Sequence, residues 1–111
     1  MQYMLLIYED ETQYSDEKAL GDMVEQHRAL VGSLGDAFKG GSGLGLSSTA
    51  TTIRTGASST KTVHDGPFVE AREQLGGYYL IDVPDLDAAL DIARRVPIRG
   101  EGSVEVRPLM E

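Results

Sequence analysis

The chain has 111 residues, ten of them basic and eighteen acidic, which gives a formal net charge of −8. This length suits a single domain, residues 1–111, with a modest core. The acidic balance argues against direct binding of nucleic acid, and the lack of cysteine excludes disulfides, thiolate metal ligands and cysteine nucleophiles. The first apolar run, residues 3–8, is too short for a membrane span or a signal segment, so the expected location is the cytoplasm.

The first part of the chain predicts a strand, a helix and a weaker strand. Residues 3–8 are apolar at every position, which is typical of a central strand that is covered on both faces. A helix is expected from about Asp16 to Leu34, ending at Gly35. Residues 38–46 follow as a weak second strand. His27 lies near the centre of the apolar stripe of the helix, which consists of Leu20, Met23, Val24, Leu30, Val31 and Leu34.

The middle of the chain predicts a β-hairpin, a tight turn and a second central strand. Residues 50–55 and 60–64 form the hairpin around the turn at 56–59. In the turn that follows, Pro67 restricts the backbone, Asp65 can cap it, and Phe68 is expected to anchor it in the core. Residues 75–83 are again apolar on both faces, and the Gly76–Gly77 pair within them indicates a bulge or a close approach by another group.

The last part predicts a helix and a final strand. The helix begins at an Asp85 N-cap and is stopped by Pro97, and its buried face consists of Leu86, Ala89, Leu90, Ala93 and Val96. The strand covers residues 103–108, with Val104 and Val106 directed inward. The whole order predicts an α+β fold, namely a ferredoxin-like antiparallel sheet with two helices on one face plus an extra β-hairpin. Because two helices cover only one face, we expect a homodimer that covers the other.

Two residues are candidates for catalysis, His27 and Asp65. A histidine inside an apolar stripe needs a hydrogen-bond partner or a cavity, so His27 is either a catalytic group or a satisfied core histidine. Asp65 is either a working carboxylate or a turn cap. We predict that His27, or failing that His64, lies near Asp65 in a pocket between the first helix and the sheet, as a general acid and base pair. No metal-ligand, P-loop or Ser-His-Asp pattern is present, so no cofactor or metal is expected.

Two motifs carry a resemblance to a known family. Residues 65–68 read Asp-Gly-Pro-Phe, and residues 73–79 read Glu-Gln-Leu-Gly-Gly-Tyr-Tyr. Together they resemble the signature of DGPF-domain proteins, a branch of the YCII-related family. Residues 3–8, 27–29 and 102–108 extend the resemblance over nearly the whole chain. Ser42 is a departure, because relatives often carry glutamate at that position.

The resemblance implies a dimeric α/β barrel and two alternative functions. The YCII-related family includes small enzymes built around a His-Asp pair, which implies general acid/base chemistry on a small organic molecule. DGPF-type domains also resemble accessory partners of extracytoplasmic-function sigma factors, which implies a non-enzymatic or ligand-sensing module. A third alternative is a dimeric scaffold in which the histidine is only structural.

Overall fold

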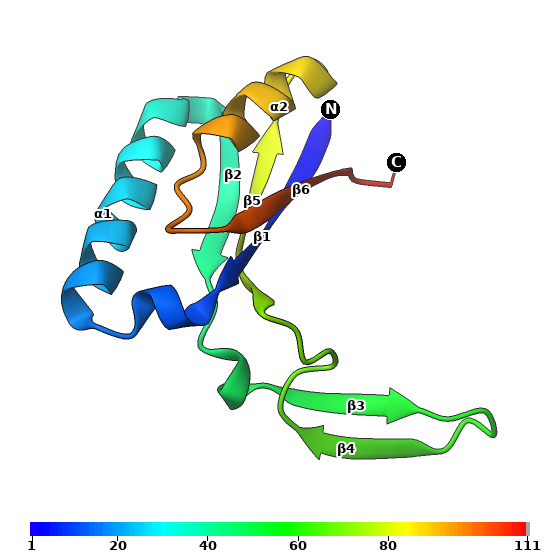
Figure 1. Ribbon diagram of the computed structural model, residues 1–111. Coiled ribbons are helices and arrows are strands. Elements are labelled where there is room, and N and C mark those ends of the chain that lie inside the picture. Colours follow the sequence, from blue (N-terminus) through cyan, green and yellow to red (C-terminus); the bar gives the residue numbers. More distant parts are fainter. Residues whose placement is uncertain (111) are drawn as a thin grey trace.

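Four strands form one antiparallel sheet in a computed structural model that describes residues 1–110 (Figure 1). The strand order is β2-β5-β1-β6, and the sheet stays open, with β2 and β6 at its edges. A separate two-stranded hairpin contains β3 and β4. The strands are β1 Gln2–Asp10, β2 Phe38–Gly43, β3 Thr51–Thr55, β4 Lys61–Asp65, β5 Glu73–Asp82 and β6 Gly102–Pro108. The α+β class and the predicted hairpin are therefore confirmed.

Two α-helices pack on one face of the sheet, α1 Glu17–Leu34 and α2 Leu86–Arg95. Each begins where the sequence predicts an N-cap, because the Asp16 carboxylate accepts a hydrogen bond from the Ala19 N–H at 2.7 Å, and Asp85 caps α2 similarly. Three short 3-10 helices complete the fold: η1 Glu11–Tyr14, η2 Gly35–Ala37 and η3 Ser47–Thr49. No helix within residues 1–110 is long and apolar enough to cross a bilayer.

The core lies between the helices and the sheet. Leu5 of β1 and Ile81 of β5 are fully buried there, beside Leu30 of α1 and Ala89 and Ile92 of α2. Three predicted core positions are corrected, since Leu20, Val24 and Leu86 are about half exposed. On α1 the buried positions are Ala19, Met23 and Leu30, so Leu20 and Val24 are each turned about 100° away from a buried neighbour.

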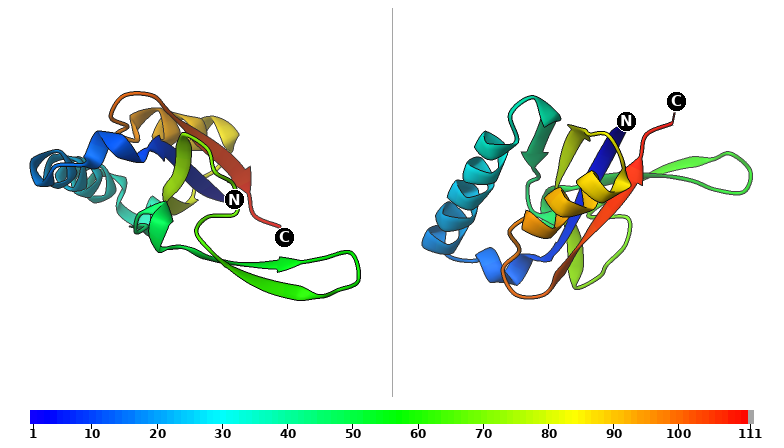
Figure 2. Two further views of the ribbon diagram at one scale, coloured as in Figure 1. Left: turned by 60° about the horizontal axis from the view of Figure 1, so that its bottom comes forward. Right: turned by 90° about the horizontal axis from the view of Figure 1, so that it is seen from above.

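The other face of the sheet carries half-buried apolar side chains and no helix among residues 1–110 (Figure 2). Met4 and Leu6 of β1 stand opposite Leu80 and Tyr78 of β5. We call this four-residue surface the open face. The two-faced apolar pattern of β1 and β5 thus reflects a core on one side and the open face on the other.

A β-bulge interrupts the pairing of β1 with β5. Ile7 pairs with Gly77 while Tyr8 pairs with Leu75, so Gly76 is an extra residue in β5. The sequence predicts that Leu75 shares a face with Tyr79, but the bulge places it beside Tyr8 instead. The bulge suggested by the Gly76–Gly77 pair is therefore confirmed.

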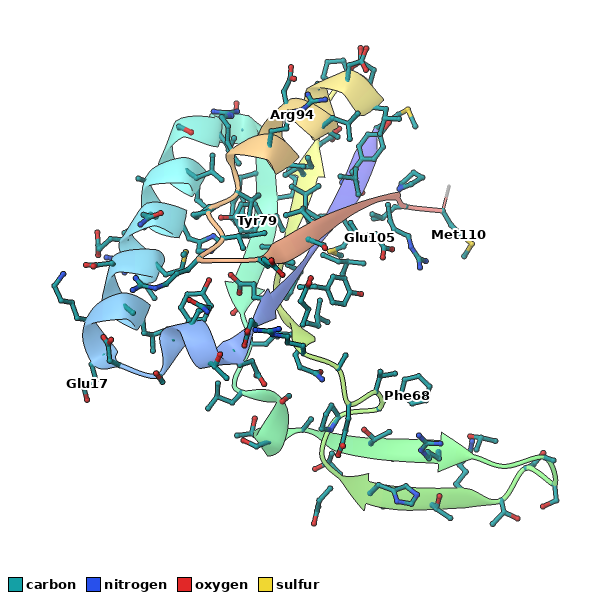
Figure 3. All side chains as sticks on the ribbon, viewed as in Figure 1. Glu17, Phe68, Tyr79, Arg94, Glu105 and Met110 are labelled. Carbon is teal, nitrogen blue, oxygen red and sulfur yellow. The ribbon has the colours of Figure 1, made fainter. Side chains whose placement is uncertain are left out.

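The predicted core position of Phe68 is wrong. Its side chain is 67% exposed in the loop between the hairpin and β5, away from the helix-covered core (Figure 3). The turn before it is tight as expected, because Gly66 has a φ of +100°, which favours glycine. That turn leads the chain back from the hairpin rather than into the sheet. Phe68 therefore lies next to the hairpin, where the Arg54 guanidinium stands 5.2 Å from the centre of its ring.

Candidate functional site

His27 lies on the inner side of α1 and meets a tyrosine from the sheet. Its Nδ1 atom is 2.6 Å from the hydroxyl oxygen of Tyr79 in β5, and the two rings meet edge to face. Figure 3 shows Tyr79 between α1 and the sheet. The predicted need for a hydrogen-bond partner on this ring is thus met by a phenol.

Tyr79 is held rigidly and remains protonated. Its side chain is 4% exposed and packs edge to face on Phe38 of β2, with ring centres 5.6 Å apart. Burial raises the pKa of the Tyr79 hydroxyl to about 12, and burial also lowers the pKa of His27 from its usual 6.5. At neutral pH the pair is therefore a neutral imidazole hydrogen-bonded to a neutral phenol.

The pair borders a cavity of about 370 Å³ between α1 and strands β1, β2 and β5. A second cavity of about 150 Å³ shares several of its residues, including His27 and Glu9. Ile7, Val24, Val31 and Phe38 give the larger cavity its apolar lining, and the polar groups are few. An apolar hollow with few polar groups is the usual form of a small-molecule site.

Glu9 is the acidic residue among those that line the larger cavity. It is only 9% exposed, and its Oε1 accepts a hydrogen bond from the Tyr14 hydroxyl at 2.6 Å. Burial, followed by this hydrogen bond, raises the pKa of Tyr14 to about 12. A β-carbon at position 76 would lie 2.7 Å from Glu9 Oε2, so the glycine of the bulge makes room for the carboxylate.

The sequence analysis missed Glu9 as a site residue. The acidic run Glu9–Glu11 after residues 3–8 predicts a polar loop over residues 9–14, whereas β1 continues through Asp10. The signal that identifies it is alternation, because Glu9 follows Tyr3, Leu5 and Ile7 at every second position, on the face that the helices cover. An acid at the next inward position of a buried strand indicates a carboxylate directed into the interior.

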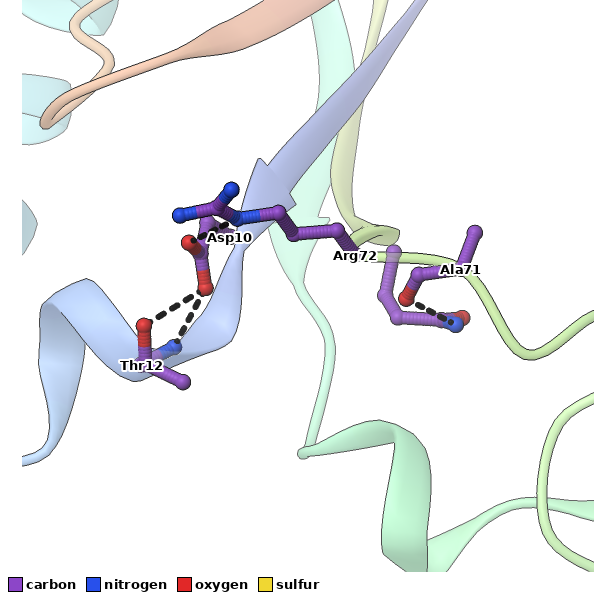
Figure 4. A network of polar contacts seen from close by, with 5 residues as sticks. Asp10, Thr12, Ala71 and Arg72 are labelled. Carbon is purple, nitrogen blue, oxygen red and sulfur yellow. Dashed lines mark hydrogen bonds and ion pairs between the residues drawn. The ribbon is translucent and has the colours of Figure 1, made fainter.

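Asp10, the neighbour of Glu9, has a structural role. Its carboxylate accepts hydrogen bonds from the Thr12 hydroxyl at 2.7 Å and the Thr12 N–H at 3.0 Å, and pairs with Arg72 Nε at 3.2 Å (Figure 4). The hydrogen bonds from Thr12, with a smaller contribution from Arg72, lower the pKa of Asp10. The contacts connect the end of β1 to the loop before β5. They therefore hold in place the segment of β1 that carries Glu9.

The structure does not bring His27 and Asp65 together within one chain. Asp65 ends β4, where it is exposed and stands opposite Thr51 in the hairpin, and no hydrogen bond joins it to His27 in residues 1–110. His64 is also exposed in β4, with Nε2 2.9 Å from the Thr62 hydroxyl oxygen. The carboxylate that shares the cavity with His27 is Glu9.

The fold and site define an open-sheet α+β protein with a histidine-lined hollow under its longer helix. The model of the YCII-related domain matches residues 1–111, so the chain belongs to the YCII-related family. It is also 41% identical over 119 aligned positions to an uncharacterised protein of Rhizobium meliloti (strain 1021), covering 98% of this chain and 92% of that one. The family resemblance is confirmed.

Proposed function

We propose that this protein is a small enzyme in which His27 acts as general acid and base on a small organic molecule. The observation that carries the proposal is the 2.6 Å contact between His27 Nδ1 and the Tyr79 hydroxyl at the wall of a largely apolar cavity. Burial keeps the imidazole neutral by lowering its pKa, and a neutral imidazole is the form that accepts a proton.

The hydrogen bond to Tyr79 prepares either direction of proton transfer. When Nδ1–H donates to the phenol oxygen, Nε2 is free to accept a proton from a bound molecule. When the phenol donates to Nδ1, Nε2 carries the hydrogen and can donate it. Tyr79, rather than Asp65, thus orients the imidazole, and Glu9 is the carboxyl group that lines the same cavity.

The cavity favours a compact substrate with an aromatic or hydrocarbon part. Its volume of about 370 Å³ is near the lower end of small-molecule sites, and Phe38 and Val31 offer apolar contact. The Glu9 carboxylate favours a hydrogen-bond donor, such as a phenolic or other acidic hydroxyl, whose proton His27 would take.

Thermal unfolding with a panel of small phenols and aromatic carboxylates tests this function. A ligand of the cavity should raise the melting temperature of the wild-type protein, and that shift should vanish in His27→Asn. Asp65→Asn is the matched control and should keep the full shift. A panel without any stabilising compound would argue against the proposal, and loss of the shift in Asp65→Asn would restore Asp65 to the site.

A homodimer of ferredoxin-like units is part of the same proposal. The order β2-β5-β1-β6 supports the ferredoxin-like arrangement, since two β-α-β halves then interleave in one antiparallel sheet. The apolar open face supports pairing with a second copy, which would complete a dimeric α/β barrel. Light scattering at micromolar concentration should report twice the mass of one chain, and a stable monomer would contradict it.

The second candidate function is a ligand-sensing accessory module for an extracytoplasmic-function sigma factor. The exposed apolar side chains of Phe68 and Val69, which line neither of the two cavities beside His27, favour a protein partner. Ligand binding without turnover, together with a direct complex with such a sigma factor, would favour this candidate over the enzyme.

A further inference from the structure

The β3–β4 hairpin, residues 51–65, stands clear of the rest of the chain, and we call it the arm (Figure 1). All of its strand residues except Thr52 are exposed. Ile53 and Val63 form a cross-strand apolar pair, yet they are 65% and 68% exposed. Because a two-stranded hairpin alone is at best marginally stable in water, an arm with this pair uncovered lacks a packing surface within its own chain.

The segment that leads into the arm is nevertheless fixed to the rest of the chain by hydrogen bonds. Glu11 accepts hydrogen bonds from the Ser47 N–H at 2.6 Å and the Ser47 hydroxyl at 2.5 Å, which fixes η3 to the body. Thr52 donates to the Gly66 carbonyl at 2.8 Å, which closes the base of the hairpin. The arm is therefore an oriented projection from the sheet rather than a loose loop.

The single chain exposes more surface than a compact protein of its size. Its accessible area is 7516 Å², whereas a folded monomer of 12.0 kDa has about 6,000 Å². Its radius of gyration is 15.7 Å, against about 13 Å for a compact chain of this length. The excess of roughly 1,500 Å² falls within the range of about 1,000–2,500 Å² that one partner contributes to an obligate homodimer interface.

The arm leaves the sheet on the side of the open face (Figure 2). A groove of about 730 Å³ lies between them, lined from the sheet by Tyr8 and Leu75 and from the loops by Leu44, Leu46, Pro67 and Phe68. Tyr8 follows Met4 and Leu6 at alternate positions of β1, so the groove continues the open face without a break.

Charge distinguishes the arm from the rest of the chain. Residues 51–65 contain two basic residues, Arg54 and Lys61, and one acidic residue, Asp65, so their net charge is +1. Since the whole chain has a net charge of −8, the rest of it has a net charge of −9. On the open-face side of β6, Glu105 opposite Leu6 is ion-paired with Arg107 opposite Met4, so the match in charge concerns the chain as a whole. A second copy of this acidic chain is thus an electrostatically matched occupant for the arm.

We infer that the arm clasps a second copy of this chain, with Ile53 and Val63 packed in the groove of that copy and on the edge of the open face beside it. Two-fold symmetry makes the contact reciprocal, so each copy gives one arm and receives one. The inference rests on the proposed homodimer and adds that its interface extends beyond the sheet to the arm.

Photo-crosslinking tests where the arm lies. Val63 is replaced by p-benzoylphenylalanine, and chains labelled with ¹⁵N are mixed with unlabelled chains before irradiation. Mass spectrometry should find peptides that join a labelled to an unlabelled chain, with attachment on residues 3–9, 44–46 or 67–80. Crosslinks confined to single chains, or attachment to an unrelated protein in place of the second copy, would overturn the inference.

Dimer dissociation measured by sedimentation separates the arm from the homodimer itself. Ile53→Thr with Val63→Thr keeps strand-forming residues but removes the apolar pair, and should raise the dissociation constant at least about tenfold. The matched control, Ser58→Ala with Thr60→Ala at the tip of the arm, should change it less than about twofold. A wild-type dimer whose dissociation constant is unchanged by the first variant overturns the arm and leaves the homodimer standing; a wild-type monomer overturns both.

Discussion

The sheet and the arm contain the same kinds of strand-forming residues, but they differ in what covers them. In β1 and β5, Leu5 and Ile81 are fully buried beneath two helices, whereas Ile53 and Val63 of the arm are about two-thirds exposed. Cross-strand pairing is regular in the arm and, apart from the bulge at Gly76, also between β1 and β5. Strand formation therefore follows from local residue preferences and turns, while burial depends on which element lies above the strand.

Truncation in the sheet should have the largest effect. Ile81→Ala removes a fully buried side chain and should lower the free energy of unfolding by about 2–5 kcal/mol in urea denaturation. Ile53→Ala, the matched change in the arm, should cost less than about 0.5 kcal/mol at concentrations where the chain is monomeric. Equal losses would show that the arm is packed within its own chain.

The hydrogen bond between α1 and the sheet should have the next largest effect. Tyr79→Phe leaves His27 Nδ1 half-buried without its partner and should cost about 1–3 kcal/mol of unfolding free energy. Tyr78→Phe, a change on the open face one residue away, is the control and should cost less. If both variants unfold alike, the His27–Tyr79 contact adds nothing to stability.

The two phenylalanines of the chain offer a smaller contrast. Phe68→Ala should cost only about 0.5–1 kcal/mol in the monomer, because the exposed ring contributes mainly its contact with Arg54. Phe38→Ala removes a ring that packs on Tyr79 and should cost more. Denaturant unfolding of both variants checks the contrast, and a larger loss at position 68 would place Phe68 in a core after all.

The smallest effect should be the contribution of His27 to the pH dependence of the free energy of unfolding. Its folded pKa lies below the unfolded value of 6.5, so its contribution to stability is complete above pH 6.5 and is lost as the pH falls through the folded pKa. NMR should show the His27 ring titrating below 6.5. In His27→Asn the difference in unfolding free energy between pH 7 and pH 5 should be smaller than in the wild type. An unchanged difference would show that other groups cause the pH dependence.

Much of the fold could be predicted from the sequence, because its signals are local. Asp16 and Asp85 are N-caps, Gly35 ends a helix, and the turn between residues 55 and 60 sets the hairpin, all through contacts within a few residues. The bulge was also visible, since paired glycines within an apolar strand are a known mark of one.

The errors arise where burial depends on distant parts of the chain. Phe68 is a large apolar residue beside a tight turn, but only the direction of the arm decides that it stays exposed. Tyr79 as the partner of His27 lies 52 residues away, so no local pattern indicates it. Glu9 was missed because its acidic neighbours Asp10 and Glu11 suggested a loop, although its position in the alternation was correct for the interior.

The extra residue in β5 also decides which face of the sheet the side chains on either side of it point to. With Gly76 in place, Leu75 turns toward the groove while Tyr79 and Ile81 turn toward the helices. A regular strand that kept all of its residues would instead place Leu75 on the same face as Gly77 and Tyr79, which is the face of Glu9. Loss of Gly76 alone would keep Leu75 opposite Tyr8 and Gly77 opposite Ile7, so both segments of the strand would keep their present faces. The extra residue therefore lets Leu75 serve the groove and Tyr79 serve the helices, although four positions separate them in the chain.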